Sequence, residues 1–230
     1  MTASSGGKAG RKLRAPAAPG RKPALSRNDV LDGAMAILDR GGHSALTVRS
    51  LAAKLGTSTK VLYTYFSNLA DLEDEIAARL IAEVRPLAAT RRQTPREQLV
   101  LLGLDLIRMH SQHPYMRMIA GPASTRVGGQ LLQQSLAALI AAGLSNERAW
   151  LCLEILQSMA YNRGMEVHRL RSGGRHAREQ FQALLAQSGR HSPIPVDSID
   201  TKDFRPERLA AFHRGVLEPA IDLLLARSAA

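Results

Sequence analysis

The stretch that decides the fold runs from Thr47 to Phe66, TVRSLAAKLGTSTKVLYTYF. Gly56 divides it, because glycine readily adopts the left-handed conformation with which many helices end. Thr47 and Ser58 belong to the residue types that cap helix N-termini, so a helix is predicted to begin after each of them. The first helix repeats apolar residues at the spacing of one helix face, at Val48, Leu51, Ala52 and Leu55. Two short helices joined by a tight turn have the spacing of a helix-turn-helix.

The second of these helices has an unusual outward face. Leu62 and Phe66 are four residues apart and are expected to point inward. The opposite face then carries an aromatic ring, an amine and hydroxyl groups, namely Lys60, Tyr63 and Thr64, with Thr59 at the edge. Solvated helix faces usually prefer Glu and Lys, so this composition favours contacts with phosphates and base edges. A helical hairpin in an ordinary all-α core is the alternative at this point.

A further helix is predicted ahead of this stretch, which completes a three-helix unit over residues 26–72. Ser26 is suited to cap it, with Asp29 three residues on as a capping acid, and the glycine pair at 41–42 ends it. Its apolar residues form one stripe that needs a partner, at Val30, Ala34, Ile37 and Leu38.

The remainder of the chain, residues 73–230, has helical patterns only, so the predicted fold class is all-α. Pro114 ends one predicted helix and Pro219 predicts a kink in the last. Residues 188–205 are proline-rich and irregular. The helices are predicted over residues 69–90, 94–112, 114–120, 124–142, 146–171, 176–187 and 206–227.

The charge distribution points to a polyanionic partner. The net charge is +11, and residues 1–25 hold six of the lysines and arginines and no acid. This tail lacks hydrophobic periodicity and is predicted to be disordered, either as a DNA-contacting arm or as a solvated linker. The single Cys152 cannot form an internal disulfide, and no run approaches the roughly 18 apolar residues of a membrane span. We therefore expect a cytoplasmic protein.

The sequence lacks the motifs of the common enzyme classes. It has no nucleophile elbow of the GxSxG type, no Walker motif and no dinucleotide-binding glycine pattern. His110 and His113 are three apart, but no acid or thiol completes a metal set at ligand spacing. We expect no enzymatic activity, no metal site and no cofactor.

The segment Leu46–Leu72, LTVRSLAAKLGTSTKVLYTYFSNLADL, resembles the N-terminal DNA-binding domain of the tetracycline-repressor (TetR) family of transcriptional regulators. The matching features are the approach through Gly42, Thr47, the LAAKLG run, Ser58 and the aromatic ending. The resemblance covers residues 26–72. The sequence departs from the family pattern at Leu69, where a lysine is usual, so one phosphate contact is expected to be missing.

The resemblance implies which residues contact DNA. Thr47, Ser58, Tyr63 and Tyr65 correspond to phosphate contacts. Arg49, Thr59, Lys60 and again Tyr63 correspond to contacts with base edges, and Thr64 shares their outward face. Arginine and lysine reach the acceptors of guanine, and a tyrosine ring meets the thymine methyl. The alternatives are an ion pair of Arg49 with Asp39, and core packing of Tyr63 and Tyr65.

One short recognition helix reads few base pairs, and the family binds pseudo-palindromes as two-fold dimers, so we expect a homodimer. The helices 146–171 and 206–227 are predicted to supply a four-helix interface through apolar residues that include Leu153, Leu156, Phe212, Val216 and Leu224. Packing within one chain is the alternative for these residues.

The resemblance also implies a ligand-binding and dimerisation domain over residues 73–230. Its small-molecule pocket is predicted from adaptable apolar side chains with a few polar groups, at Met109, Met116, Trp150, Met159, Tyr161 and Asn162. Ordinary core packing is the alternative for each of them.

The predicted function is a sequence-specific DNA-binding transcriptional regulator, a repressor that binds a palindromic operator in double-stranded DNA and is released by an unknown small-molecule effector. Two other functions stay open. The basic tail would suit a non-specific architectural DNA-binding protein, and the lost lysine at Leu69 would suit a helical sensing module that no longer binds DNA.

Overall fold

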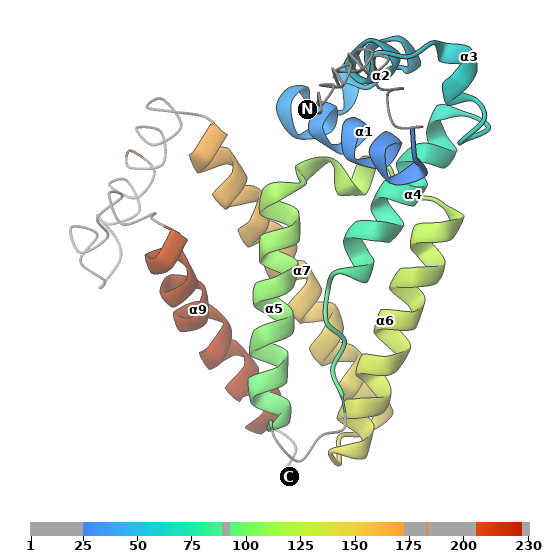
Figure 1. Cartoon of the computed structure of the whole chain (residues 1–230). Helices are drawn as coiled ribbons and strands as arrows, with labels where there is room; N and C mark the ends of the chain where they lie inside the picture. Colours follow the sequence, from blue (N-terminus) through green and yellow to red (C-terminus); the bar gives the residue numbers. More distant parts are fainter. Residues whose placement is uncertain (1–24, 89–92, 173–182, 184–205, 227–230) are drawn as a thin grey trace, which may run out of the picture.

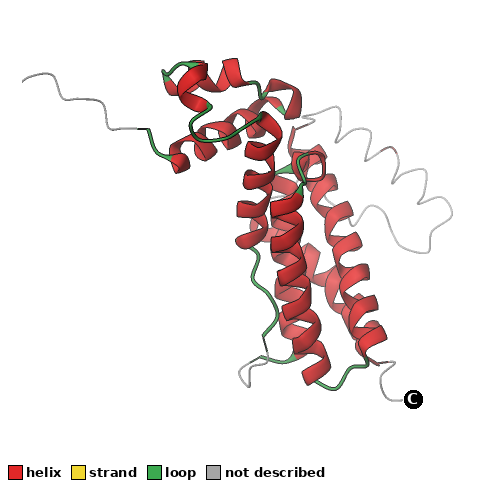
Figure 2. Cartoon of the chain, turned by 90° about the vertical axis from the view of Figure 1, so that its right-hand side faces the viewer, coloured by secondary structure: helices red, strands yellow, loops and turns green. Residues whose placement is uncertain are grey.

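The computed structural model describes residues 25–88, 93–172, 183 and 206–226. Throughout these ranges the chain forms helices and connecting loops and no strand (Figure 2). A small N-terminal unit sits on one end of a long helical bundle (Figure 1). The predicted all-α fold with an N-terminal helix-turn-helix is confirmed.

The N-terminal unit contains α1 (Arg27–Gly41), the 3-10 turn η1 (His43–Ala45), α2 (Val48–Leu55) and α3 (Thr59–Leu62). The predicted caps are present. Ser26 and Asp29 form a capping box at the start of α1, and the Thr47 side chain accepts a hydrogen bond from the Ser50 N–H at the start of α2. Gly56 ends α2 with φ of 62°, in the left-handed region that the tight turn requires.

The recognition helix α3 is shorter than the sequence pattern predicts, because it ends at Leu62 and not near Phe66. Beyond it, the Thr64 N–H bonds to the carbonyl of Val61 at 3.1 Å and the Tyr65 N–H to that of Leu62 at 2.9 Å. These i to i+3 bonds tighten the backbone into turns. Leu62 and Phe66 are nevertheless buried as predicted, since the turns keep both side chains on the inner side.

Helix α4 (Leu69–Ala82) joins the N-terminal unit to the bundle (Figure 1). It ends at Ala82, whereas the sequence predicted a helix to residue 90. Pro86 has no N–H to donate to the carbonyl of Ala82 and its ring would clash there, so the helix stops ahead of it. Arg79 of α4 pairs with Asp32 of α1 at 2.7 Å, which ties the two units together.

The bundle is completed by α5 (Pro95–Gln112), the 3-10 turn η2 (Pro114–Met118), α6 (Pro122–Ala141), α7 (Asn146–Ser172) and α9 (Pro206–Ala226). Helix α5 packs against α7 and α9, and α6 packs against α4. Pro219 lies inside α9. Apart from residue 183, the predicted helix 176–187 lies outside the described residues, as do the basic tail up to residue 24 and the irregular segment 188–205.

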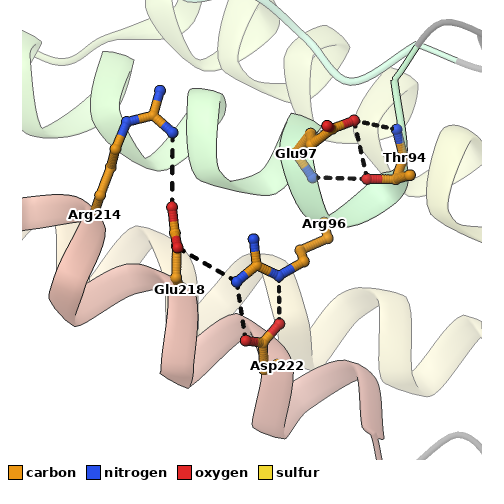
Figure 3. Close-up of polar contacts among 6 residues, drawn as sticks. All are labelled: Thr94, Arg96, Glu97, Arg214, Glu218 and Asp222. Atoms are coloured by element: carbon orange, nitrogen blue, oxygen red, sulfur yellow. Dashed lines mark hydrogen bonds and ion pairs between the residues drawn. The ribbon is translucent and has the colours of Figure 1, made fainter.

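A charged network holds α9 against the first turn of α5 (Figure 3). The guanidinium of Arg96 bonds to Asp222 at 2.5 and 3.0 Å and to Glu218 at 3.4 Å, and Arg214 lies 3.7 Å from Glu218. The hydrogen bonds with Asp222 are the largest cause that raises the pKa of Arg96. Because these side chains are well exposed, the network connects α9 to α5 but is expected to add little to the free energy of unfolding.

Candidate nucleic-acid interface and ligand cavity

The predicted base-contacting residues belong to α2, α3 and the residue that follows α3, in the N-terminal unit at one end of the molecule (Figure 1). Arg49, Thr59, Lys60 and Tyr63 are all exposed, and the exposed fraction of Tyr63 is 53%. Neither Arg49 nor Lys60 forms an ion pair with any described residue. The four side chains are therefore available to a partner, and Tyr63 is not a core residue.

The alternative ion pair of Arg49 with Asp39 is not formed. Asp39, at the end of α1, instead accepts a hydrogen bond from the hydroxyl of Tyr115 at 2.7 Å and lies 2.9 Å from Nδ1 of His113. Burial is the largest cause that raises the pKa of Tyr115, so its hydroxyl stays a donor. Asp39 thus connects the N-terminal unit to η2 of the bundle.

Two predicted phosphate contacts act as helix caps. The hydroxyl of Thr47 accepts from the Ser50 N–H at 3.0 Å, and that of Ser58 accepts from the Val61 N–H at 3.3 Å. Both side chains are exposed. At the start of α2 the positive end of the helix dipole adds to the attraction for a phosphate beside Thr47.

Two further hydroxyl groups of this region, those of Tyr65 and Thr64, make internal bonds. Tyr65 is half-buried, and its hydroxyl donates to the backbone carbonyl of Leu25. A phosphate contact from this hydroxyl would require that bond to break, so the geometry does not support Tyr65 as strongly as Thr47. Thr64 is exposed and donates to the carbonyl of Val61 at 2.7 Å.

Leu69 has a structural role where the family pattern has a lysine. Its side chain is half-buried and packs against the hydrophobic core. The cap of α4 comes from Asn68, which accepts from the Asp71 N–H at 3.0 Å. The first turn of α4 therefore presents a polar cap and an acid to its surroundings and no cation.

Sequence reasoning missed Val61, an apolar side chain of α3 that is 40% exposed beside Tyr63. The positions of Leu62 and Phe66 fix the inner face of this segment, so the same pattern contained the signal that Val61 faces outward. An exposed apolar group on a recognition helix is suited to the thymine methyl.

The bundle contains a partly open cavity of about 620 Å³ between α4, α5, η2, α6 and α7. Its wall is mostly apolar, with Leu102, Leu106, Met109, Leu132, Leu153 and Leu156 among the residues that line it. Of the six predicted ligand residues, the structure brings only Met109 and Met116 to this cavity. A second, more polar hollow of about 450 Å³ is lined by Tyr161 and Asn162. Met159 packs against the core, and Trp150 is 48% exposed on the outside of α7.

His110, Arg117 and Gln157 line both hollows and were not predicted as ligand residues. Burial, together with the smaller effect of the charge of Arg117, lowers the pKa of His110 to about 4. His110 is therefore neutral at physiological pH. The sequence offered one signal, since His110 directly follows the predicted pocket residue Met109 on α5.

The structure corrects the prediction that Leu153 and Leu156 belong to the dimer interface. Both are buried within the chain, with exposed fractions of 6% and 2%, because this side of α7 faces α5 and the cavity. Val216 and Leu224 of α9 are half-buried, and the Phe212 side chain lies outside the described residues. The apolar residues of these two helices that are exposed are Trp150, Leu151, Ile155 and Leu223.

Two other features complete the description of residues 25–88, 93–172, 183 and 206–226. Within them, no three histidine, cysteine or acidic side chains gather where they could hold a metal ion. Their helices also include none with the length and apolar composition needed to cross a membrane. Cys152 is buried, and burial raises the pKa of its thiol, so it behaves as a core residue.

Comparisons with known proteins agree with this geometry. The family model described as bacterial regulatory proteins, tetR family, matches residues 30–76. The uncharacterized HTH-type transcriptional regulator Rv0681 of Mycobacterium tuberculosis is 30% identical over 159 residues, which cover 64% of this chain and 72% of the relative. The HTH-type transcriptional repressor DrrR1 of Streptomyces coeruleorubidus is 29% identical over 111 residues, which cover 46% of this chain and 41% of the relative.

Among solved structures, the Streptomyces coelicolor TetR family protein ActR in complex with (S)-DNPA has the same fold. It aligns with a TM-score of 0.59 over 88% of this chain and 98% of ActR, at 24% identity. The shared arrangement therefore includes both the N-terminal unit and the helical bundle.

Proposed function

The chain belongs to the tetR family of bacterial regulatory proteins, and from this membership we propose that it is a repressor that binds a pseudo-palindromic operator as a homodimer and leaves it when a small-molecule effector binds. As a family member it is a DNA-binding transcriptional regulator and not an enzyme. Such a role requires access to chromosomal DNA and hence a cytoplasmic location. The observation that carries the proposal is the exposed face of α2 and α3, where cationic side chains have no partner within the described residues.

We assign base recognition to Arg49, Thr59, Lys60 and Tyr63. Arg49 and Lys60 are long cations that reach the two acceptors of guanine in the major groove, and the Thr59 hydroxyl bonds to either base type. The Tyr63 ring and the neighbouring Val61 present apolar surface to the thymine methyl. Because neither cation must first break an internal ion pair, their full interaction energy is available to DNA.

Phosphate contacts orient the protein but carry no sequence information. We assign them to the caps Thr47 and Ser58, with Tyr63 and Tyr65 as further contacts at the edge of the same face. Since Leu69 packs in the core in place of the usual lysine, the basic tail would supply part of the missing attraction to phosphates. Its six cationic residues suit that role.

The proposed dimer uses the outer faces of α7 and α9. Leu151 and Ile155 are one turn apart on α7 and are 48% and 39% exposed, and Leu223 of α9 is 67% exposed. Exposed large apolar side chains on two neighbouring helices are suited to a partner surface. A two-fold axis would bring both helices of each chain into one four-helix interface.

Effector release requires that the ligand bind one conformation of the protein better than another. Two contacts connect the walls of the cavity to α4 and to the N-terminal unit. Asp74 of α4 accepts from the N–H groups of Ala123 and Ser124, at 2.7 and 2.8 Å, at the start of α6. Tyr115 of η2 donates to Asp39 of α1. A ligand that displaces α6 or η2 would move α4 and α1, and with them the recognition helix.

Two comparisons favour this function over the alternatives. DrrR1 is named a transcriptional repressor, and ActR is described in complex with a small molecule. A dimer that covers a promoter operator excludes RNA polymerase without further chemistry, which is why repression is the simplest outcome of such binding.

The test is selection of bound sequences from a random pool of double-stranded DNA with the full chain. The proposal predicts an enriched palindrome with half-sites centred about one helical turn apart. Tight, salt-dependent binding without enrichment would identify an architectural protein. A lack of binding would indicate a sensing module that no longer reads DNA.

A further inference from the structure

The cavity has an uneven distribution of charge. Arg117 of η2 is the one charged side chain among the described residues that line it, and none of the lining residues is an acid. Arg117 forms no ion pair with a described residue. Arg85 and Arg96 of the bundle differ in this respect, since they pair with Asp105 and Asp222.

Arg117 is held at the boundary between the cavity and the second hollow. Its guanidinium carbon lies 4.8 Å from the centre of the Tyr161 ring, which is a cation–π geometry. The ring of His110 meets the same Tyr161 edge-on, with centres 5.2 Å apart and an interplanar angle of 89°. One tyrosine of α7 therefore positions both the arginine and the histidine.

His110 adds a second, independent observation. Its side chain is 93% buried, since its exposed fraction is 7%, and it lines both hollows. No described residue forms a hydrogen bond with its ring. A neutral imidazole at this position offers one donor to an incoming ligand, beside the positive charge of Arg117.

We propose that the cavity binds an amphipathic organic anion, whose carboxylate or similar group contacts Arg117 and His110 and whose apolar body packs against Leu102, Leu106 and Met109. This inference rests on the proposed function, because it names the class of effector for the same cavity. The volume of about 620 Å³ lies within the roughly 300–1,000 Å³ of sites for drug-sized ligands.

The charges nearby argue against a cationic ligand. Glu154 is the acid that faces this region among the described residues, and it lines the second hollow only. Both Glu154 and Arg117 are exposed, but only Arg117 lines the cavity. An ammonium group in the cavity would lie close to Arg117 without an acid to pair with it.

The test uses three probes with the same ten-carbon chain, namely decanoate, decanamide and decylammonium, titrated calorimetrically into the full chain. We expect decanoate to bind about tenfold more tightly than decanamide, as a charge-assisted hydrogen bond implies, and decylammonium to bind most weakly. Arg117→Gln should abolish the preference for decanoate. Arg126→Gln removes an exposed arginine of α6 that lines neither hollow, and it should leave the preference unchanged.

A second variant locates the binding. A Cβ added at Gly129 of α6 meets nothing within 4 Å, although Gly129 lines the cavity. Gly129→Leu should therefore fill the cavity without disturbing the fold, and circular dichroism checks the fold. The affinity for each probe that binds the wild type should fall at least tenfold.

The outcomes separate the two proposals. Equal or tighter binding of decanamide by the wild type would overturn the anionic assignment and leave an effector cavity in place. Failure of all three probes to bind the wild type, or undiminished binding by Gly129→Leu, would overturn the anionic assignment together with the assignment of this cavity as the effector site. Decanoate binding that does not release selected operator DNA would contradict the effector mechanism alone.

Discussion

The helix-turn-helix unit and the helical bundle use their cationic side chains in opposite ways. On the outer face of α2 and α3, Arg49 and Lys60 are exposed and have no carboxylate partner within the described residues. In the bundle, Arg85 and Arg96 are paired with carboxylates of α5 and α9. Arg85 and Arg96 connect helices through these pairs, whereas Arg49 and Lys60 are free to contact a negatively charged partner.

One unpaired cation of the bundle lines the cavity. Arg117 faces no acid in the cavity and rests on a tyrosine ring. A cation without a carboxylate partner therefore supports a DNA-binding surface on the N-terminal unit and an anion site in the bundle. Mutations that distinguish paired from unpaired groups test this comparison.

The largest expected effect is on the buried hydrogen bonds between α4 and the start of α6. Asp74 is 8% exposed and accepts two hydrogen bonds from the start of α6. Asp74→Ala leaves both N–H groups without a partner, so we expect it to lower the free energy of unfolding by about 3 kcal/mol. Chemical denaturation measures this value. Asp32→Ala, which removes the exposed pair with Arg79, is the control and should lower it by less than about 1 kcal/mol.

The same carboxylate gives the stability a dependence on pH. Desolvation raises the pKa of Asp74, but its hydrogen bonds with Ser124 and its neighbours outweigh this and leave the pKa below the ordinary value. Its contribution is thus fully present above about pH 4, the pKa of an unfolded aspartate, and is lost as the pH falls through the lower folded value. Wild type and Asp74→Ala should converge in stability in acid; a constant difference between them would contradict this assignment.

The next largest effect is on DNA affinity. Arg49→Ala and Lys60→Ala should each weaken binding to the selected operator by about 1–3 kcal/mol, as measured by fluorescence anisotropy. Because neither side chain has an internal ion pair, thermal stability should stay at the wild-type value. Arg126→Ala provides the control for loss of one positive charge. Equal losses of affinity in all three variants would show that net charge alone matters.

A smaller effect is expected at the proposed dimer surface. Leu151→Glu places a charge on the exposed apolar face of α7, and we expect the dissociation constant of the dimer to rise about tenfold, equivalent to 1.4 kcal/mol. Sedimentation equilibrium measures it. Met118→Glu alters another exposed apolar residue, 65% exposed on η2, and should have no effect. A wild-type protein that is monomeric at micromolar concentration would contradict the dimer.

The smallest effect is expected for Arg96, whose ion pairs with α9 are drawn in Figure 3. Arg96→Ala removes an exposed network between α5 and α9, so the free energy of unfolding should fall by no more than about 1 kcal/mol. Its affinity for operator DNA should be unchanged at protein concentrations that keep the dimer intact. A loss of affinity comparable to that of Arg49→Ala would break the distinction between paired and unpaired cations.

The sequence predicted those parts of the fold that depend on local chemistry. The caps at Ser26, Thr47 and Ser58 and the left-handed Gly56 are all present, because each is specified by a residue and its near neighbours. The end of α4 was predicted too late. Pro86 cannot donate a hydrogen bond to the carbonyl of Ala82, so the helix ends at Ala82. The apolar periodicity continues beyond Ala82 and therefore predicted a longer helix.

Features that depend on packing between helices were predicted less well. Periodicity identified Leu153 and Leu156 as one apolar face of α7, but it does not indicate whether a second chain or α5 covers that face. Likewise, Met109 lines the cavity and Trp150 does not. Both are apolar residues of predicted helices, so the sequence alone could not separate them. The assignments of individual DNA contacts stay predictions.

The most direct test of the central claim is to repeat the selection of bound DNA with Arg49→Ala and compare its preferred sequence with that of the wild type. We predict that the variant still enriches a palindrome but loses its preference at a symmetric pair of positions, one in each half-site. An enriched sequence identical to that of the wild type would contradict base recognition by this unpaired cation.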